Sequence, residues 1–221
     1  MKKSLLFVVS ALFAFMFNID GIYAKSSKNN HKNFGIIVSG PSGVGKTSVI
    51  EGLLNLHKDE LVASISATTR APRIGEINGK HYHFVDREKF KTLVKKNEFL
   101  EYSENYGNFY GTPRRNYIEA VENGIDIIFA LSVDGMIKAK KNKKMDFVTV
   151  FILPPSEKIL YERLKNRKTE NSRQLENRIK KAKEELSQAT KYDYMVYNID
   201  LDSAVKQLDA IYLAEQKKRE K

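Results

Sequence analysis

The stretch that decides the fold is Gly40-Pro41-Ser42-Gly43-Val44-Gly45-Lys46-Thr47, which fits the phosphate-binding pattern G-x-x-x-x-G-K-S/T. Glycines let the backbone curl until successive N–H groups point at one phosphate chain. Lys46 places a compact positive charge on the β- and γ-phosphates, and the Thr47 hydroxyl can ligate Mg²⁺. The stretch therefore predicts a site for a nucleoside triphosphate.

The segments on either side have the pattern that such a loop needs. Residues 34–39 form a short apolar run, typical of a buried strand, and residues 47–54 carry apolar side chains at helical spacing. The N-terminus of a helix would thus face the bound anion. The alternative is a glycine-rich turn that only connects a strand to a helix.

Strand and helix patterns alternate along the rest of the chain, which predicts an α/β fold with a parallel sheet flanked by helices. Apolar runs typical of strands buried on both faces occupy residues 34–39, 125–131, 147–153 and 194–199. The last helix is expected to begin with Asp202 or Ser203 as its N-cap. Its core stripe is predicted to be Val205, Leu208, Ile211 and Tyr212.

Two segments depart from this alternation. Residues 65–112 contain shorter strands and a hairpin signal at Asn78-Gly79, which predicts a small mixed subdomain inserted into the sheet protein. Residues 157–190 have the pattern of two helices rich in Arg, Lys and Glu. A charged helical hairpin beside a phosphate loop is expected to act as a lid.

Composition limits the remaining possibilities. A formal net charge of +11 over 221 residues indicates an anionic partner, and nucleotides satisfy that requirement. Lysine runs such as residues 138–144 lack interleaved aromatics, so we expect solvated surfaces and no nucleic-acid partner. Cysteine is absent, which excludes disulfides, thiolate catalysis and cysteine-based zinc sites. His81 and His83 are better interpreted as polar strand residues than as metal ligands.

The N-terminus has the layout of a secretory signal peptide. A positive start precedes an apolar run over residues 5–17, and Ala24 is followed by a polar stretch. Asn18 and Asp20 make that run too short for a stable membrane span. A cleaved signal is the first interpretation, and an uncleaved anchor or an incorrectly assigned start codon remains open.

A second set of residues is suited to another phosphate group. Arg70 and Arg73 surround a proline, and guanidinium groups recognise phosphate through planar, bidentate contacts. Tyr82 and Tyr110 each carry a hydroxyl donor on a rigid ring. Glu101 is an acid inside an apolar stretch, and its carboxylate could accept two adjacent N–H groups, which guanine offers and adenine does not.

The order and spacing of these motifs resemble the guanylate kinase family. The similarity covers about residues 34–214 and runs through Thr68 to Val85, Asn97 to Glu101 and Gly107 to Thr112. It continues through the segments Phe151-Ile152-Leu153-Pro154-Pro155-Ser156, Arg163-Leu164-x-x-Arg167, Asn177-Arg178 and Tyr192-Asp193-Tyr194-x-Val196-x-Asn198.

The resemblance implies the reaction ATP + GMP ⇌ ADP + GDP with Mg²⁺, without a covalent intermediate. ATP would be bound by Gly40, Pro41, Ser42, Gly43, Val44, Gly45, Lys46, Thr47 and Asn198, with Thr47 also on the metal. GMP would be bound by Arg70, Arg73, Tyr82, Glu101, Tyr110, Thr112 and Ser132. The catalytic residues would be Lys46, Arg163, Arg167 and Arg178.

The same resemblance organises the chain into functional units. It implies a core over residues 34–64, 119–153 and 191–214, a GMP-binding unit over 65–118 and a lid over 154–190. Outside them lie the signal-like leader 1–24, the polar linker 25–33 and a basic tail, 215–221. A cytoplasmic location is implied, whereas the leader suggests export or organelle targeting. We expect a monomer or weak homodimer with no stable membrane span.

The chain departs from the family at the strand end after residue 129. The family usually has aspartates where this chain has Ala130 and Ser132, and glutamine where it has Asp134. Those aspartates support the hydrated Mg²⁺ and guanine recognition, so reduced activity is expected, although Ser132 can still accept a guanine N–H. In the lid, Asn166 and Lys168 replace usual glycines.

Three functions stay open on these residues. The first is an active but impaired guanylate kinase. The second is a degenerate kinase fold that serves as a nucleotide- or protein-binding module, although an intact phosphate loop argues against it. The third is a kinase for another nucleoside monophosphate, against which Glu101 and Thr112 argue.

Overall fold

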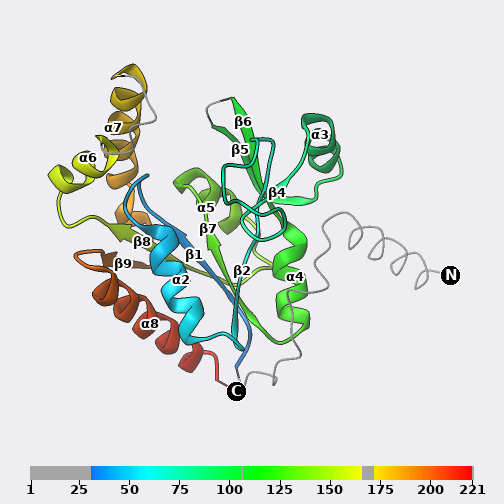
Figure 1. Ribbon diagram of the computed structural model, residues 1–221. Coiled ribbons are helices and arrows are strands. Elements are labelled where there is room, and N and C mark those ends of the chain that lie inside the picture. Colours follow the sequence, from blue (N-terminus) through cyan, green and yellow to red (C-terminus); the bar gives the residue numbers. More distant parts are fainter. Residues whose placement is uncertain (1–30, 106, 166–171, 221) are drawn as a thin grey trace.

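The computed structural model describes residues 31–105, 107–165 and 172–220 (Figure 1). The leader 1–24 lies outside these residues, as do Asn166, Arg167 and Lys168 of the expected lid. Within the described part of the chain, no helix combines the length and apolar character that a membrane crossing requires.

A five-stranded parallel sheet forms the centre of the molecule, in the order β2-β7-β1-β8-β9. Its strands are β1 (Gly35–Ser39), β2 (Leu61–Ala63), β7 (Asp126–Ala130), β8 (Phe147–Leu153) and β9 (Tyr194–Tyr197). Helices pack on both faces of the sheet (Figure 1). The predicted fold class is therefore confirmed.

Each face of the sheet has its own hydrophobic core, because successive strand residues point in opposite directions. Ile36 and Val38 of β1 point toward the core covered by α2 (Lys46–Leu56) and α8 (Leu201–Lys217). Ile37 points toward the core covered by α4 (Arg114–Glu122) and α5 (Val133–Lys140). This two-sided burial explains why the strands are continuous apolar runs in the sequence.

Four of the core strands match the predicted runs, and the fifth, β2, was not predicted. It is only three residues long, Leu61–Ala63, and just one of them is fully buried. Such a short strand carries too few apolar residues to show the alternation of apolar and polar side chains from which strands are predicted. It exists because it pairs with β7, with Leu61 opposite Asp126.

A second, four-stranded sheet is built from the segment between β2 and β7, in the order β4-β3-β6-β5. It comprises β3 (Ala67–Thr68), β4 (His83–Phe84), β5 (Phe99–Asn105) and β6 (Asn108–Pro113), with α3 (Arg87–Lys95) packed beside it. Both parallel and antiparallel pairs occur, as expected for a mixed subdomain.

The hairpin predicted at Asn78-Gly79 is wrong. Gly79 does adopt a positive φ of 79°, and its N–H donates to Tyr82 O at 2.8 Å, so the turn signal is genuine. However, the strand that follows, β4, pairs in parallel with β3 rather than with the residues before the turn. Tertiary pairing with a distant strand has overridden the local signal.

The charged segment after β8 forms two helices, α6 (Glu157–Lys165) and α7 (Ser172–Leu186), followed by a short 3₁₀ helix, η1 (Ala189–Lys191). Helices α6 and α7 pack together above the carboxyl ends of the core strands, close to the start of α2 (Figure 1). The prediction of two helices is confirmed, with the second ending at Leu186 rather than at residue 190.

The last helix begins earlier than predicted. Its N-cap is Asp200, whose carboxylate accepts from the Ser203 N–H at 2.8 Å, and not Asp202 or Ser203. All three residue types suit an N-cap, and the backbone, extended at Asp200, decides between them. The predicted stripe is confirmed: Leu208 and Tyr212 are fully buried, and Val205 and Ile211 pack against the same core.

Both ends of the described chain are tied to the core. His31, from the expected polar linker, is buried with its Nε2 2.8 Å from Asp126 Oδ2. The expected basic tail is helical up to Lys217, and Arg219 pairs with Asp146 at 3.0 Å. The His31 and Arg219 side chains therefore stabilise the fold, because each contacts an acid from another part of the chain.

Candidate active site

The phosphate loop joins β1 to α2, and its glycines are required by its shape. Gly40, Gly43 and Gly45 have positive φ angles of 150°, 82° and 97°. A Cβ at Gly40 would lie 2.6 Å from the backbone O of Ile152, and one at Gly45 would lie 2.5 Å from Asn198 Nδ2. Both the backbone conformation and the neighbouring atoms therefore exclude side chains here.

Lys46 is the first residue of α2, and its ammonium folds back over the loop. Its Nζ donates to Gly40 O at 2.6 Å and to Pro41 O at 3.1 Å. Thr47 follows on the exposed first turn of the helix. A cation and a hydroxyl are thus placed at a helix N-terminus, which is an anion-binding geometry.

Asn198, predicted to bind ATP, supports the phosphate loop through hydrogen bonds. Its side chain is buried, and its Nδ2 donates to Val44 O at 2.6 Å, while its backbone N–H donates to Leu153 O at 2.8 Å. It therefore ties the end of β9 to the loop and to β8. A stabilising role of this kind was not predicted from the sequence.

Arg70 is held by an acid whose role sequence reasoning missed. The guanidinium makes a bidentate pair with Glu76, with nitrogen–oxygen distances of 2.9 and 2.8 Å. The Glu76 carboxylate also accepts from the Arg73 N–H at 2.7 Å. One carboxylate thereby organises the loop that carries both predicted arginines. The spacing Arg70-x₅-Glu76 was visible in the sequence and could have suggested the pair.

The two predicted tyrosines lie together beside these arginines. The rings of Tyr82 and Tyr110 are 6.1 Å apart in an edge-to-face arrangement, and the Arg70 guanidinium lies 5.5 Å from the centre of the Tyr82 ring. Thr68 fixes this group, since its hydroxyl donates to Phe109 O at 3.0 Å and accepts from the Arg70 N–H. The residues predicted for a second anion site therefore lie near one another, with Arg70 and Arg73 on the loop after β3, Tyr82 just before β4 and Tyr110 on β6.

Glu101 and Thr112 lie directly opposite each other on neighbouring strands of the second sheet, where β5 pairs with β6. The Thr112 hydroxyl donates to Glu101 Oε1 at 2.7 Å. Glu101 is only 9% exposed, and this burial raises the pKa of its carboxyl, while Thr112 and Lys138 oppose the rise. A buried carboxyl beside a hydroxyl is a candidate for ligand recognition, because acids with a shifted pKa are common at functional sites.

A cleft of about 360 Å³ brings the two sets of residues together. The part of the chain that the structure describes contributes Gly40, Ser42, Lys46, Arg73, Tyr82, Asn105, Tyr110, Ala130, Leu131, Ser132, Arg178, Lys181 and Glu185. This lining does not include Arg70, Glu101, Thr112 or Arg163, and Arg167 lies outside the described residues. Besides Ala130, four contributors, Asn105, Leu131, Lys181 and Glu185, were not predicted as site residues.

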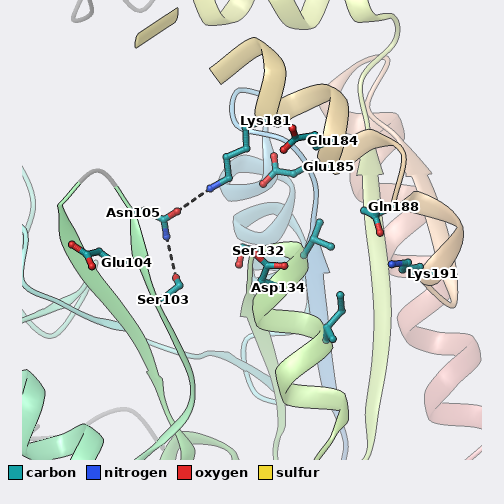
Figure 2. A pocket seen from close by; sticks show the side chains of 12 residues that line it. Ser103, Glu104, Asn105, Ser132, Asp134, Lys181, Glu184, Glu185, Gln188 and Lys191 are labelled. Atoms are coloured by element: carbon teal, nitrogen blue, oxygen red, sulfur yellow. Dashed lines mark hydrogen bonds between the residues drawn. The ribbon is translucent and has the colours of Figure 1, made fainter. Parts of the chain in front are cut away.

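A second cleft of about 420 Å³ lies beside the first, between β5, α5 and α7 (Figure 2). Ser132, Lys181 and Glu185 line both clefts. Ser132 is the N-cap of α5, and its Oγ accepts from the Gly135 N–H at 3.1 Å. Asp134 lines the second cleft and is exposed on the first turn of α5.

The residues present suit Mg²⁺ that arrives with a nucleotide. Within residues 31–105, 107–165 and 172–220, no group of three or more His, Asp or Glu side chains could hold a metal. The exposed Thr47 hydroxyl offers one hard oxygen ligand at the helix N-terminus. Mg²⁺ commonly keeps several waters and takes substrate phosphates as ligands, so one protein oxygen is compatible with its binding.

Lowering the pH is expected to weaken the ion pair by which Glu76 holds the loop that carries Arg70 and Arg73. The hydrogen bond from Arg70 lowers the pKa of Glu76 to about 2, well below the ordinary range of a glutamate. A carboxyl with a lowered folded-state pKa stabilises the fold above its unfolded pKa and loses that effect as the pH falls. Urea unfolding of the protein and of Glu76→Gln should differ by about 1 kcal/mol at pH 7. This difference should shrink between about pH 4.5 and pH 2, whereas a constant difference would contradict the ion pair.

The comparisons with known proteins agree with one another. A family model described as guanylate kinase matches residues 32–215. A guanylate kinase of Clostridium perfringens strain SM101 is 42% identical over 192 residues, covering 87% of this chain and 88% of that protein. One of Rickettsia felis is 44% identical over 189 residues, covering 85% and 97%. The crystal structure of guanylate kinase from Anaplasma phagocytophilum is similar with a TM-score of 0.68 and 33% identity, covering 84% and 87%.

Proposed function

The chain belongs to the guanylate kinase family, and from this membership we propose that it transfers the γ-phosphoryl group of ATP to GMP, giving ADP and GDP. One observation carries the proposal: the phosphate loop and the residues Arg73, Tyr82 and Tyr110 line the same cleft. Two anion sites that share one cleft suit a transfer between two nucleotides. A binding module for one nucleotide has no use for the second site.

On this proposal, the phosphate loop binds ATP and the second anion site binds GMP. Lys46 exchanges its bonds to the loop carbonyls for phosphate oxygens of ATP, and a charge-assisted contact replaces two neutral ones. Arg73, Tyr82 and Tyr110 hold the GMP phosphate, with Arg70 kept in place by Glu76. Glu101 and Thr112 read the guanine.

The transfer then follows from position and charge. An oxygen of the GMP phosphate attacks the γ-phosphorus, a new P–O bond forms, and the bond from the γ-phosphorus to the bridging oxygen breaks to release ADP. Arg178 of α7 lines the cleft and is suited to neutralise the equatorial oxygens. Arg163 lies on α6 and would have to approach as the lid closes, and Arg167 is assigned by resemblance alone.

Mg²⁺ would be held from the protein side by the Thr47 hydroxyl, and it supplies charge neutralisation to the phosphates. Two acids lie nearby: Glu185 lines both clefts and Asp134 lines the second, and each belongs to a helix rather than to a core strand. Ala130, at the end of β7, presents no oxygen to the ion. We therefore propose an active enzyme with reduced metal affinity.

A carboxylate introduced at position 130 should raise the affinity for Mg²⁺ if its absence is what lowers that affinity. Ala130 is exposed and lines the cleft opposite Val38 of β1, so an Ala130→Asp side chain has space. We expect kcat or the affinity for Mg²⁺ to rise, by up to about 10- to 100-fold, as for other groups that support a metal. Initial rates over a Mg²⁺ titration measure this, with Asn142→Asp on the surface as the charge-matched control. Unchanged kinetics would mean that another acid, such as Glu185, already fills the role.

The activity itself is tested by coupled ADP release with GMP, AMP and UMP at millimolar Mg²⁺. Turnover with GMP well above that with AMP supports the proposal. Turnover with another monophosphate would assign a different acceptor. Binding of GMP without turnover of any acceptor would instead identify a binding module.

A further inference from the structure

Helix α7 presents one row of charged side chains to the cleft. Arg178, Lys181 and Glu185 are spaced three and four residues apart, so they share one face of the helix. All three line the cleft that contains the phosphate loop and the second anion site. The proposed mechanism uses Arg178 and leaves Lys181 without a role.

Lys181 is connected directly to the second sheet. Its Nζ donates to Asn105 Oδ1 at 2.9 Å, and Asn105 Nδ2 in turn donates to Ser103 Oγ at 3.0 Å. Figure 2 shows the lysine side chain extending from α7 across the gap to the end of β5. The two parts of the molecule that would enclose the nucleotides are thus joined by one ammonium group.

The surroundings of Lys181 favour a negatively charged partner. Its positive charge, with that of Lys46, opposes the rise that burial causes in the pKa of Glu185. At the end of the central sheet, Ala130 and Ser132 add no negative charge to the cleft. An ammonium has three N–H donors, so Lys181 can keep its bond to Asn105 and still donate to a phosphate oxygen.

We propose, resting on the proposed function, that Lys181 is a further phosphate-binding residue, which contacts the phosphate chain when both nucleotides are bound, and that Asn105 positions its ammonium. Lys181 lines the cleft that contains both the loop that would hold ATP and residues of the site that would hold GMP. Its contact is therefore formed most fully when one phosphate chain extends across both sites.

The probe is adenosine–guanosine pentaphosphate, in which a single phosphate chain joins the two nucleosides. Its affinity is measured by calorimetry for the unaltered protein, Lys181→Met, Lys181→Arg and the matched control Lys180→Met on the exposed face of α7. We expect Lys181→Met to bind the pentaphosphate about tenfold or more weakly, which is the scale of a hydrogen bond to a charged group. Lys181→Arg should retain most of the affinity, and Lys180→Met should match the unaltered protein.

Asn105 is tested as a positioning residue in the same series. Asn105→Leu should weaken binding of the pentaphosphate more than binding of ATP alone, and Asn105→Gln, which keeps a neutral acceptor oxygen, should restore part of it. A merely structural role would lower the melting temperature and would affect ATP and the pentaphosphate alike. Equal effects on the two ligands would overturn the assignment of Asn105.

Two further outcomes separate this inference from the proposed function. If the unaltered protein phosphorylates GMP and Lys181→Met binds the pentaphosphate with unchanged affinity, the inference is wrong and the function stands. If the unaltered protein neither phosphorylates GMP nor binds the pentaphosphate, the proposed function fails and the inference fails with it.

Discussion

Replacing Lys46 by alanine is expected to lower kcat/KM for ATP by about 100- to 1,000-fold, the usual cost of removing one preorganised charge from a transition state. The ammonium already lies against the loop, 2.6 Å from Gly40 O, so it has little distance to move when phosphate arrives. Steady-state rates at saturating GMP measure the loss. Lys58→Ala, at an exposed lysine beyond the end of α2, serves as the control.

A comparison with Arg70→Ala tests whether the two sites are separate. Lys46→Ala should cost more in ATP affinity than Arg70→Ala, and less in GMP affinity. The reason is that Lys46 belongs to the phosphate loop, whereas Arg70 is paired with Glu76 on the loop between β3 and β4. The reverse order would contradict the assignment of ATP and GMP to these sites.

The second large effect is expected from Glu101→Gln, which should lower kcat/KM for GMP by about 100-fold or more. A glutamine keeps one acceptor and replaces the other by a donor, which would face a guanine N–H in a buried site. The KM for ATP should change little, because Glu101 belongs to the second sheet. Glu104→Gln, on the exposed part of the same strand, is the matched control.

The pH dependence of the unaltered enzyme provides an independent check. Burial raises the pKa of Glu101, so its carboxylate becomes protonated at a higher pH than an ordinary glutamate does. Since the proposed contact needs the ionised form, kcat/KM for GMP should fall on acidification, and the fall should begin above the usual glutamate range. A GMP profile that follows the ATP profile throughout would place the titrating group elsewhere.

Local sequence patterns predicted what local interactions determine. The phosphate loop, the long core strands and the stripe that ends at Tyr212 depend on spacing within one element, and they were found. The strand β2 and the parallel partner of β4 depend on pairing with distant residues, so no local signal revealed them. The proximity of the two proposed anion sites could not be predicted either, because it depends on how distant parts of the chain fold together.

The roles that sequence reasoning missed follow the same physical division. Asn198 supports the phosphate loop through a hydrogen bond to Val44, 154 positions away in the chain. Lys181 meets Asn105 across 76 positions. Both residue types are common on surfaces, so only the tertiary structure distinguishes these two from their neighbours. Glu76 is the exception, because its partner Arg70 is six residues away and the pair could have been predicted.

His31, the first described residue, is joined to the core through Asp126. Buried Asp126 accepts from the Tyr212 hydroxyl at 3.0 Å and from the Phe34 N–H at 3.1 Å, and it also contacts His31. One carboxylate therefore connects the first described residue, the central sheet and the last helix. A shortened form that lacks His31 is expected to be less stable, because the buried Asp126 Oδ2 would keep the Tyr212 hydroxyl but lose its other partner.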